Sequence, residues 1–286
     1  MRITLTLAVA TIVTTLAACG GNNSPDAVGK DDGSLSRVRG AGKLTVCSSN
    51  DVPYFYRDPK SGQLTGTDYD MIKAIAERIG VPKVELYEVP ISGIIPALNS
   101  RRCDIIGDNI AITIKRSKEV DFSAPMYRAG QALVVPKGNR AKILTQDDFG
   151  GHSVGSYQGT VQLDYLKELA KKDPTIRVKE YKNITEIVAD LEAGRLDAGA
   201  FDDMVAAAMI KANPSLGIEV INYKLPIGDY TVGAAFRKGD VALRHAFNDG
   251  NQQVARDGTL SQIFAKWGLT PAEKYEPYPG CCAPPA

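Results

Sequence analysis

The chain has 286 residues, of which 34 are lysine or arginine and 33 are aspartate or glutamate. This balance leaves no basic stripe, so nucleic-acid binding is not expected. After the N-terminus, no apolar stretch reaches the roughly 20 residues that a membrane-spanning helix needs, which argues against a membrane receptor. The remaining length is sufficient for one large domain or two small ones.

The N-terminus has the pattern of a cleaved signal peptide over residues 1–18. Arg2 supplies a positive start, and the apolar run from Ile3 to Ala17 is too short to cross a bilayer. The run ends in Leu16-Ala-Ala-Cys19, which resembles a bacterial lipobox. We therefore expect a lipid on Cys19, which anchors the protein in the periplasm or on the outer cell surface and is its only contact with the membrane. The alternative is an ordinary secretory signal with an incidental cysteine.

Both ends of the mature chain have compositions that disfavour folding. Residues 19–39, rich in Gly, Asn, Ser and Asp, predict a lipidated flexible tether, with folded protein from about Gly40. Residues 271–286 form a Pro-rich tail with Cys281 and Cys282, which either has no function or forms an intermolecular bond. Four cysteines remain besides Cys19, and an oxidising compartment allows three ways of pairing them.

From Leu44 onward, short β-rich runs alternate with amphipathic helices. Strands are expected at 44–48, 84–89 and 104–107, separated by a helix capped by Asp68 and a short helix at 94–99. This β-α-β-α-β order predicts a mostly parallel sheet flanked by helices.

The same order recurs later, with strands at 153–156, 177–180 and 197–201 and helices at 160–171 and 183–193. The two halves share the pattern L-x-x-x-R-x-D, from Leu98 to Asp104 and from Leu191 to Asp197, which suggests two similarly built lobes. Segments 129–136 and 230–236 are expected to cross between them, so that helices at 241–256 and 260–267 pack on the first lobe. The prediction is an α/β clamp with two hinge crossings, in which lobe 1 spans 40–128 and 233–270 and lobe 2 spans 129–232.

Polar residues follow several predicted strands, where open α/β sheets bind ligands. Arg116 is suited to bind a carboxylate through two parallel hydrogen bonds, although its spacing also fits a surface arginine. The helix start at Thr160 and Val161 either offers N–H groups to an anion or is a plain turn capped by Thr160. Of Asp202 and Asp203, one is expected to cap a helix and the other to bind an ammonium. Together these residues predict a zwitterion trap whose partners lie on opposing lobes.

Several short motifs carry a resemblance to a known family. They are Gly66-Thr-Asp-Tyr-Asp70, Gly93-Ile-Ile-Pro-Ala-Leu98, Asp104 through Thr113 to Arg116, Val120-Asp-Phe-Ser-Ala-Pro125, Gly159-Thr160, Gly194-Arg-Leu-Asp197, Arg237-Lys-Gly-Asp240 and Asp257-Gly-Thr-Leu260. In this order, from about Lys43 to Gly268, the chain resembles the periplasmic amino-acid-binding proteins of ABC transporters, solute-binding family 3. The resemblance implies the two-lobe type II periplasmic binding protein fold, a monomer without cofactor, metal or enzymatic activity, and an ABC permease as partner.

The resemblance also implies roles for individual residues. Arg116 binds the α-carboxylate of an amino acid, with help from backbone amides at Ala111 and Val161. Asp202 binds the α-ammonium, beside the carbonyl of Asn109.

The chain departs from the family in the part of the pocket that holds the ligand side chain. Ser49 stands where the family often has an acid, and Ile91 where an aromatic residue is common. Asp51 or Tyr54 would compensate if the loop is shifted. Asp108 lies where small or hydroxyl residues are usual, and a buried carboxylate needs a partner. Asp108 therefore predicts either a cationic or amide donor on the ligand, or an internal pair with a basic residue. Ala111 is a further departure, because a hydroxyl residue is usual at its position.

The fold that the resemblance implies places the strands at 44–48 and 104–107 side by side and parallel. By register, Cys47 then lies next to Cys103 or Asp104. This adjacency predicts a disulfide between Cys47 and Cys103.

Two other functions are open at this point. Some secreted dehydratases of cyclohexadienyl amino acids share the fold, but His152 and His245 form no nucleophile–base arrangement, so acid–base chemistry would fall to Asp108, Asp51 or Glu88. A non-transport accessory clamp is the other alternative, suggested by the unusual pocket and the cysteine-containing tail.

Overall fold

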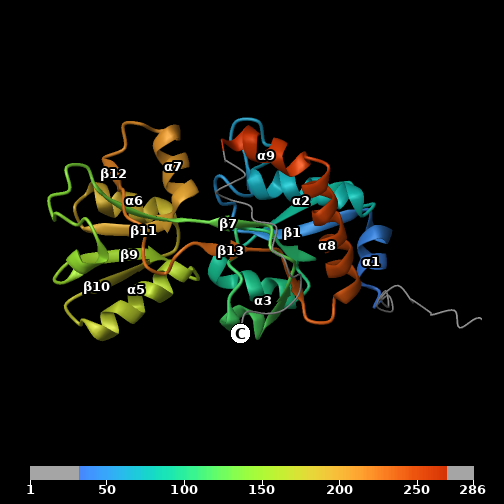
Figure 1. Cartoon of the computed structure of the whole chain (residues 1–286), viewed down its shortest axis with the longest axis horizontal. Helices are drawn as coiled ribbons and strands as arrows, with labels where there is room; N and C mark the ends of the chain where they lie inside the picture. Colours follow the sequence, from blue (N-terminus) through green and yellow to red (C-terminus); the bar gives the residue numbers. More distant parts are fainter. Residues whose placement is uncertain (1–31, 269–286) are drawn as a thin grey trace, which may run out of the picture.

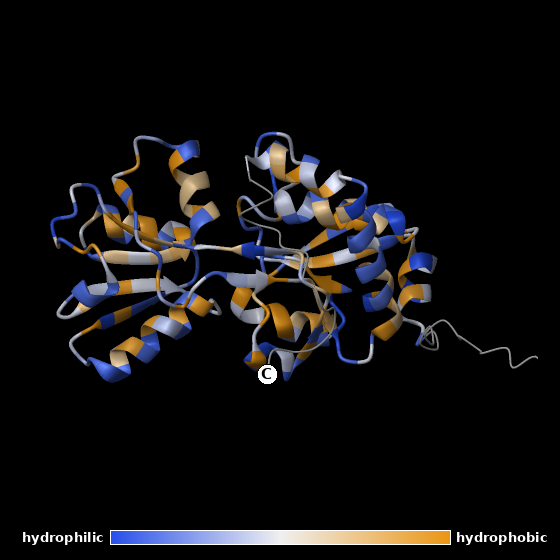
Figure 2. Cartoon of the chain, viewed as in Figure 1, coloured by the Kyte–Doolittle hydropathy of each residue, from blue (hydrophilic) through white to orange (hydrophobic). Residues whose placement is uncertain are grey.

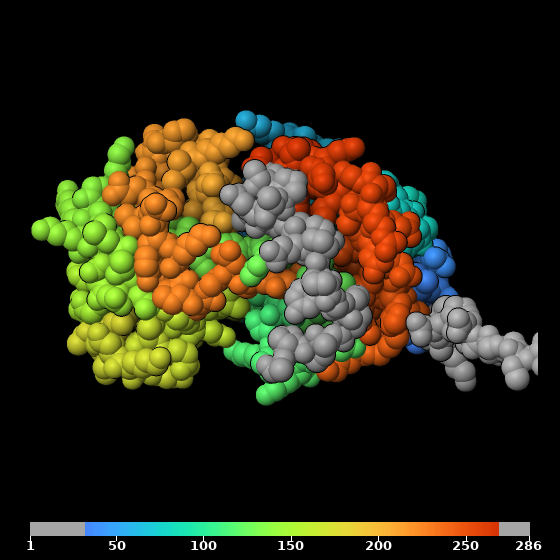
Figure 3. Space-filling model, viewed as in Figure 1, coloured from blue at the N-terminus to red at the C-terminus, as the bar shows by residue number. Residues whose placement is uncertain are grey.

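The computed structural model describes residues 32–268, which form two α/β lobes joined by two hinge strands (Figure 1). The expected signal peptide, Cys19, Cys281 and Cys282 lie outside this range. In the described part of the chain, no helix is long and apolar enough to span a membrane. The space-filling view shows the middle of the chain (yellow to orange) at one end of the molecule and its blue and red segments at the other (Figure 3).

Lobe 1 is built on a five-stranded sheet. Its strands are β1 (Lys43–Ser48), β4 (Lys83–Glu88), β5 (Ile105–Ile106), β6 (Val120–Phe122) and β14 (Ala235–Arg237), in the order β4-β1-β5-β14-β6. The first three are parallel, and β14 and β6 are antiparallel to their neighbours. The remaining elements are α1 (Ser34–Ala41), α2 (Thr67–Arg78), α3 (Ile94–Asn99), α4 (Ile114–Ser117), α8 (Val241–Arg256), α9 (Thr259–Trp267), the 3-10 turn η1 (Ile91–Gly93) and the hairpin of β2 (Tyr56–Arg57) and β3 (Leu64–Thr65).

Lobe 2 repeats this architecture. Its strands are β8 (Gln131–Pro136), β9 (Ser153–Tyr157), β10 (Arg177–Tyr181), β11 (Ala198–Asp202) and β12 (Ile218–Ile221), in the order β10-β9-β11-β8-β12. β10, β9 and β11 are parallel, and β8 is antiparallel to both of its neighbours, β11 and β12. The helices are α5 (Val161–Lys172), α6 (Ile184–Glu192), α7 (Asp203–Ala212) and the 3-10 helix η2 (Gln146–Phe149). The predicted fold class, two mostly parallel α/β lobes with two crossings, is confirmed.

α2 and α6 form where apolar spacing and caps predict helices. Asn183 caps α6 by accepting a hydrogen bond from the Glu186 N–H, and the buried face of α2 carries apolar residues at helical spacing. The helices show both hydrophobic and hydrophilic residues along their length (Figure 2). The expectation that Asp68 caps α2 is wrong: Gly66 holds the cap position, and the Asp68 carboxylate is buried against the hinge.

The repeated L-x-x-x-R-x-D pattern has the same physical role in both lobes. The Asp104 carboxylate accepts a hydrogen bond from the Thr45 N–H at 3.0 Å, and the Asp197 carboxylate accepts one from the Ser153 N–H at 2.7 Å. In each lobe this aspartate therefore ties the start of the third parallel strand to the first. The pattern marks two lobes built by the same rule.

The two hinge strands are shorter than the predicted crossings. They are β7 (Tyr127–Ala129) and β13 (Tyr230–Val232), which pair antiparallel between the lobes (Figure 1). Most of the predicted segment 129–136 is β8 of lobe 2, and the end of 230–236 is the start of β14 of lobe 1.

Residues 34–39, expected in the flexible tether, are helical in α1. Val38 is 1% exposed, and α1 packs against α8. Ser34 Oγ accepts from the Leu243 N–H at 3.0 Å, and Asp32 Oδ2 accepts from the Ala242 N–H at 2.9 Å, so that both cap the start of α8. The polar composition of this segment serves these contacts with a helix 200 residues away, which composition alone does not predict.

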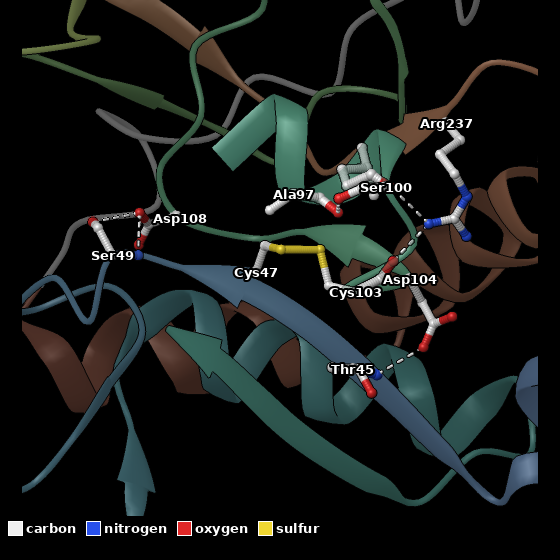
Figure 4. Close-up of a disulfide and its surroundings, with 10 residues drawn as sticks. Thr45, Cys47, Ser49, Ala97, Ser100, Cys103, Asp104, Asp108 and Arg237 are labelled. Carbon is white, nitrogen blue, oxygen red and sulfur yellow. Dashed lines mark hydrogen bonds between the residues drawn. A yellow bond between two sulfur atoms is a disulfide. The ribbon is translucent and has the colours of Figure 1, made fainter. Parts of the chain in front are cut away.

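The predicted disulfide between Cys47 and Cys103 is present, with the two Cα atoms 5.5 Å apart (Figure 4). The predicted register is wrong, because Cys47 pairs with Ile106 across β1 and β5. Cys103 precedes β5 in the turn after α3, where the N–H of the next residue, Asp104, donates to the Thr45 carbonyl of β1 at 2.7 Å. Arg237 stabilises this turn by donating hydrogen bonds to the carbonyls of Leu98 and Cys103.

Candidate ligand-binding cleft

A cavity lies between the two lobes beside the hinge. Nine of the ten predicted site residues line it: Ser49, Ile91, Asp108, Asn109, Ala111 and Arg116 from lobe 1, and Thr160, Val161 and Asp202 from lobe 2. Sequence reasoning missed the contributions of Tyr157, Gln162 and Tyr230, which also line it, and named Asp51 as a residue that compensates for the missing acid at Ser49 or takes part in acid–base chemistry. The lining follows the ends of β1, β5, β9 and β11, where the fold predicts a ligand.

Tyr54 is the predicted site residue that does not line the cavity. It is fully buried, and its hydroxyl has no hydrogen-bond partner within residues 32–268. Asp51, three residues earlier, faces the cavity instead. The loop after β1 thus supplies a carboxyl group, that of Asp51, to the cavity, although Ser49 itself has none.

Arg116 lies in lobe 1's short helix α4. Thr113 caps this helix by accepting a hydrogen bond from the Arg116 N–H at 3.1 Å. The guanidinium donates to the carbonyl of Ala111 on its own lobe and to that of Gly159 on lobe 2, both at 2.8 Å. Arg116 is therefore a cleft residue that touches both lobes, and the alternative of a plain surface arginine is wrong.

The carboxylate of Asp202 is the centre of the polar contacts in the cleft. It is 4% exposed and accepts hydrogen bonds from Gln162 Nε2 at 2.7 Å, from Asn109 Nδ2 at 3.2 Å and from the Tyr230 hydroxyl. Burial raises the pKa of Asp202 to about 6, although these donors oppose the rise. At neutral pH it is an anion surrounded by neutral donors, which suits an incoming ammonium group.

A buried hydrogen-bond chain connects Asp202 to the hinge and to α2. Asn109 Nδ2 donates to the Tyr230 hydroxyl at 2.7 Å, and Asn109 Oδ1 accepts from the Tyr127 hydroxyl at 3.1 Å. The Asp68 carboxylate accepts from the Tyr127 hydroxyl at 2.7 Å and from the Asn109 N–H at 2.6 Å. Because Tyr127 lies on β7 and Tyr230 on β13, this chain links the cleft to both hinge strands.

The carboxylate of Asp108 is satisfied by neutral donors. Ser48 Oγ donates to its Oδ1 at 2.6 Å, and the Ser49 N–H and Oγ donate to its Oδ2 at 2.8 and 2.6 Å. Figure 4 shows the Ser49–Asp108 contacts at the end of the strand that carries Cys47. Burial nevertheless raises the pKa of Asp108. The predicted internal pair with a basic residue is therefore wrong, because two serines take that place.

The start of α5 approaches lobe 1 closely. Thr160 caps α5 by accepting from the Leu163 N–H, as one of the two alternatives predicted. Gly159, just before it, has φ +89°, and a Cβ atom there would lie 2.9 Å from the Ser92 nitrogen. Glycine is therefore required both by its backbone conformation and by the contact between lobes.

The fold and the cleft are those of a two-lobe solute-binding protein. The chain matches the family of bacterial extracellular solute-binding proteins, family 3, over residues 44–270, and it belongs to that family.

The chain is 30% identical to the L-cystine-binding protein TcyJ of Escherichia coli (strain K12) over 83% of this chain and 86% of the relative. It is 32% identical to a probable histidine-binding protein of Neisseria gonorrhoeae over 93% and 96%. The solved structure of an ancestral arginine-binding protein bound to arginine is 37% identical, covers 79% of this chain and 98% of that one, and superposes with a TM-score of 0.72. These relatives are named as binding proteins, which agrees with the prediction that the chain is not an enzyme.

Proposed function

We propose that this protein is the lipid-anchored substrate-binding component of an ABC importer and captures an amino acid between its lobes. The observation that carries the proposal is that Arg116 of lobe 1 and Asp202 of lobe 2 line the same cavity. A guanidinium binds a carboxylate through paired hydrogen bonds, and a carboxylate binds an ammonium. Relatives named for cystine, histidine and arginine support an amino acid as the ligand.

In this proposal the ligand replaces contacts that the cleft now makes with itself. The α-carboxylate takes the Arg116 guanidinium from the Ala111 and Gly159 carbonyls and accepts from backbone N–H groups at Ala111 and Val161. The α-ammonium donates to Asp202. Because each lobe supplies part of the ligand's polar contacts, the bound amino acid favours the closed state.

The proposed anchor is a lipid on Cys19, attached to the mature N-terminus. The residues after Cys19 lead to α1, which lies at the end of lobe 1 remote from lobe 2 (Figure 1). Attachment there leaves the cleft accessible to solute and both lobes accessible to a permease.

The test is a thermal-shift screen of the mature, unlipidated chain after unfolding and refolding to remove co-purified ligand. At least one L-amino acid should raise the melting temperature, since a hundredfold excess over Kd stabilises by about 2.7 kcal/mol. The shift should disappear in Arg116→Ala and persist in Arg140→Ala, which removes an exposed arginine of lobe 2. The absence of a shift with every amino acid would refute the proposal.

A further inference from the structure

The cleft contains more carboxyl groups than the backbone groups of an amino acid require. Three carboxyl groups line it, those of Asp51, Asp108 and Asp202, against one guanidinium, that of Arg116. In the proposed function, Asp202 and Arg116 are matched by the ligand ammonium and carboxylate. Two carboxyl groups, Asp51 and Asp108, remain without a positive partner.

The protein does not neutralise these two groups itself. Within residues 32–268, neither Asp51 nor Asp108 forms an ion pair with a lysine, arginine or histidine. Burial and the nearby charges of Asp108 and Asp202 raise the pKa of Asp51. A cation placed beside Asp51 would relieve this repulsion, whereas a neutral group would not.

The two carboxyl groups differ in how many hydrogen bonds their oxygens already accept from the protein. Both oxygens of Asp108 accept short hydrogen bonds from Ser48 and Ser49, at 2.6 to 2.8 Å. The side-chain contact of Asp51 in the described range is with the Tyr157 hydroxyl, at the long distance of 3.5 Å. A carboxylate has about four acceptor positions, so Asp51 is the group that can accept hydrogen bonds from a new donor. Asp108, which lines the same cavity, contributes through its charge.

We propose that Asp51, supported by the charge of Asp108, binds a positively charged side-chain group of the ligand, so that the protein selects cationic amino acids. The inference rests on the proposed function, because it places the ligand backbone between Arg116 and Asp202. Ile91 and Tyr157, which line the same cavity, offer apolar surface for the aliphatic stem of such a side chain.

The test compares ligands that differ in side-chain charge and little else. Isothermal titration calorimetry of the refolded mature chain is performed with arginine and its neutral isostere citrulline, and with lysine and Nε-acetyl-lysine. In at least one pair the cation should bind ten times more tightly or better. Asp51→Asn should reduce that preference at least tenfold while changing the affinity for the neutral ligand less than threefold.

Two further variants control for folding and for overall charge. Asp51→Glu keeps the carboxylate and should retain a preference for the cation. Asp249→Asn removes one charge from an exposed position on α8 and should leave both affinities unchanged. If Asp51→Asn does not fold, Asp51→Ser serves as the neutral variant, with circular dichroism to confirm its structure.

The outcomes separate this inference from the proposed function. If neutral ligands bind as tightly as cations, or if the preference survives Asp51→Asn, the cationic assignment is overturned and amino-acid binding stands. If no amino acid binds at all, both fail.

Discussion

Removal of the Cys47–Cys103 disulfide should lower the free energy of unfolding by about 4 kcal/mol. The bond closes a loop with a sequence separation of 56 residues. The chain-entropy relation for a loop of that length gives about 14 cal/mol/K, which is about 4 kcal/mol at 25 °C. Both cysteines lie in a hydrophobic cluster, at 0% and 3% exposure, so alanine is the replacement that introduces no buried polar group.

The assay is equilibrium unfolding in urea of Cys47→Ala/Cys103→Ala against the parent protein. Both proteins carry alanine at Cys19, Cys281 and Cys282, so that no other thiol pair forms in either. The urea concentration at the midpoint of unfolding should be lower in the variant, while the slope of the free energy of unfolding against urea concentration should stay similar. A loss below about 1 kcal/mol would contradict the argument that this bond restricts the unfolded chain.

Three other changes test separate parts of the account. Val38→Ala should reduce the free energy of unfolding by about 2 kcal/mol in urea melts, because Val38 is buried in the helix that replaces the expected tether; no loss would mean that α1 is not part of the domain. Gly159→Ala should weaken amino-acid binding at least tenfold in calorimetry, because its Cβ meets Ser92 across the cleft, whereas Gly138→Ala, with a similar φ of +84° and open space around it, should bind normally. Burial raises the pKa of Asp68 to about 7, above the usual value near 3.9, so the folded state holds this proton more tightly than the unfolded state. This contribution to stability is therefore lost as the pH rises from about 4 through 7. The melting temperature of ligand-free protein should fall over this pH range, and Asp68→Asn should make that fall smaller. A wild-type profile unchanged by Asp68→Asn would refute the assignment.

The part of the fold that follows from local sequence was predictable. Caps such as Asn183 and Thr160 and the apolar face of α2 depend on residues within one or two helical turns. The repeated aspartates Asp104 and Asp197 were visible as a pattern, and the structure supplies their reason, a hydrogen bond to the first strand of each lobe.

The failed predictions concern contacts between distant segments. The serines that satisfy Asp108 lie about 60 positions earlier in the chain, and Tyr230 reaches Asp202 across 28 positions. The contacts of Asp32 and Ser34 with the start of α8 span more than 200. Composition and periodicity carry no information on such pairs, so the tether boundary and the partner of Asp108 were beyond the sequence.

The most direct test of the central claim is a crystal structure of the protein with the amino acid that gives the largest thermal shift. We expect the ligand carboxylate within hydrogen-bond distance of the Arg116 guanidinium and the ammonium within that distance of the Asp202 carboxylate, with the lobes closed on both. A ligand bound elsewhere, or one whose carboxylate and ammonium contact other groups, would contradict the account.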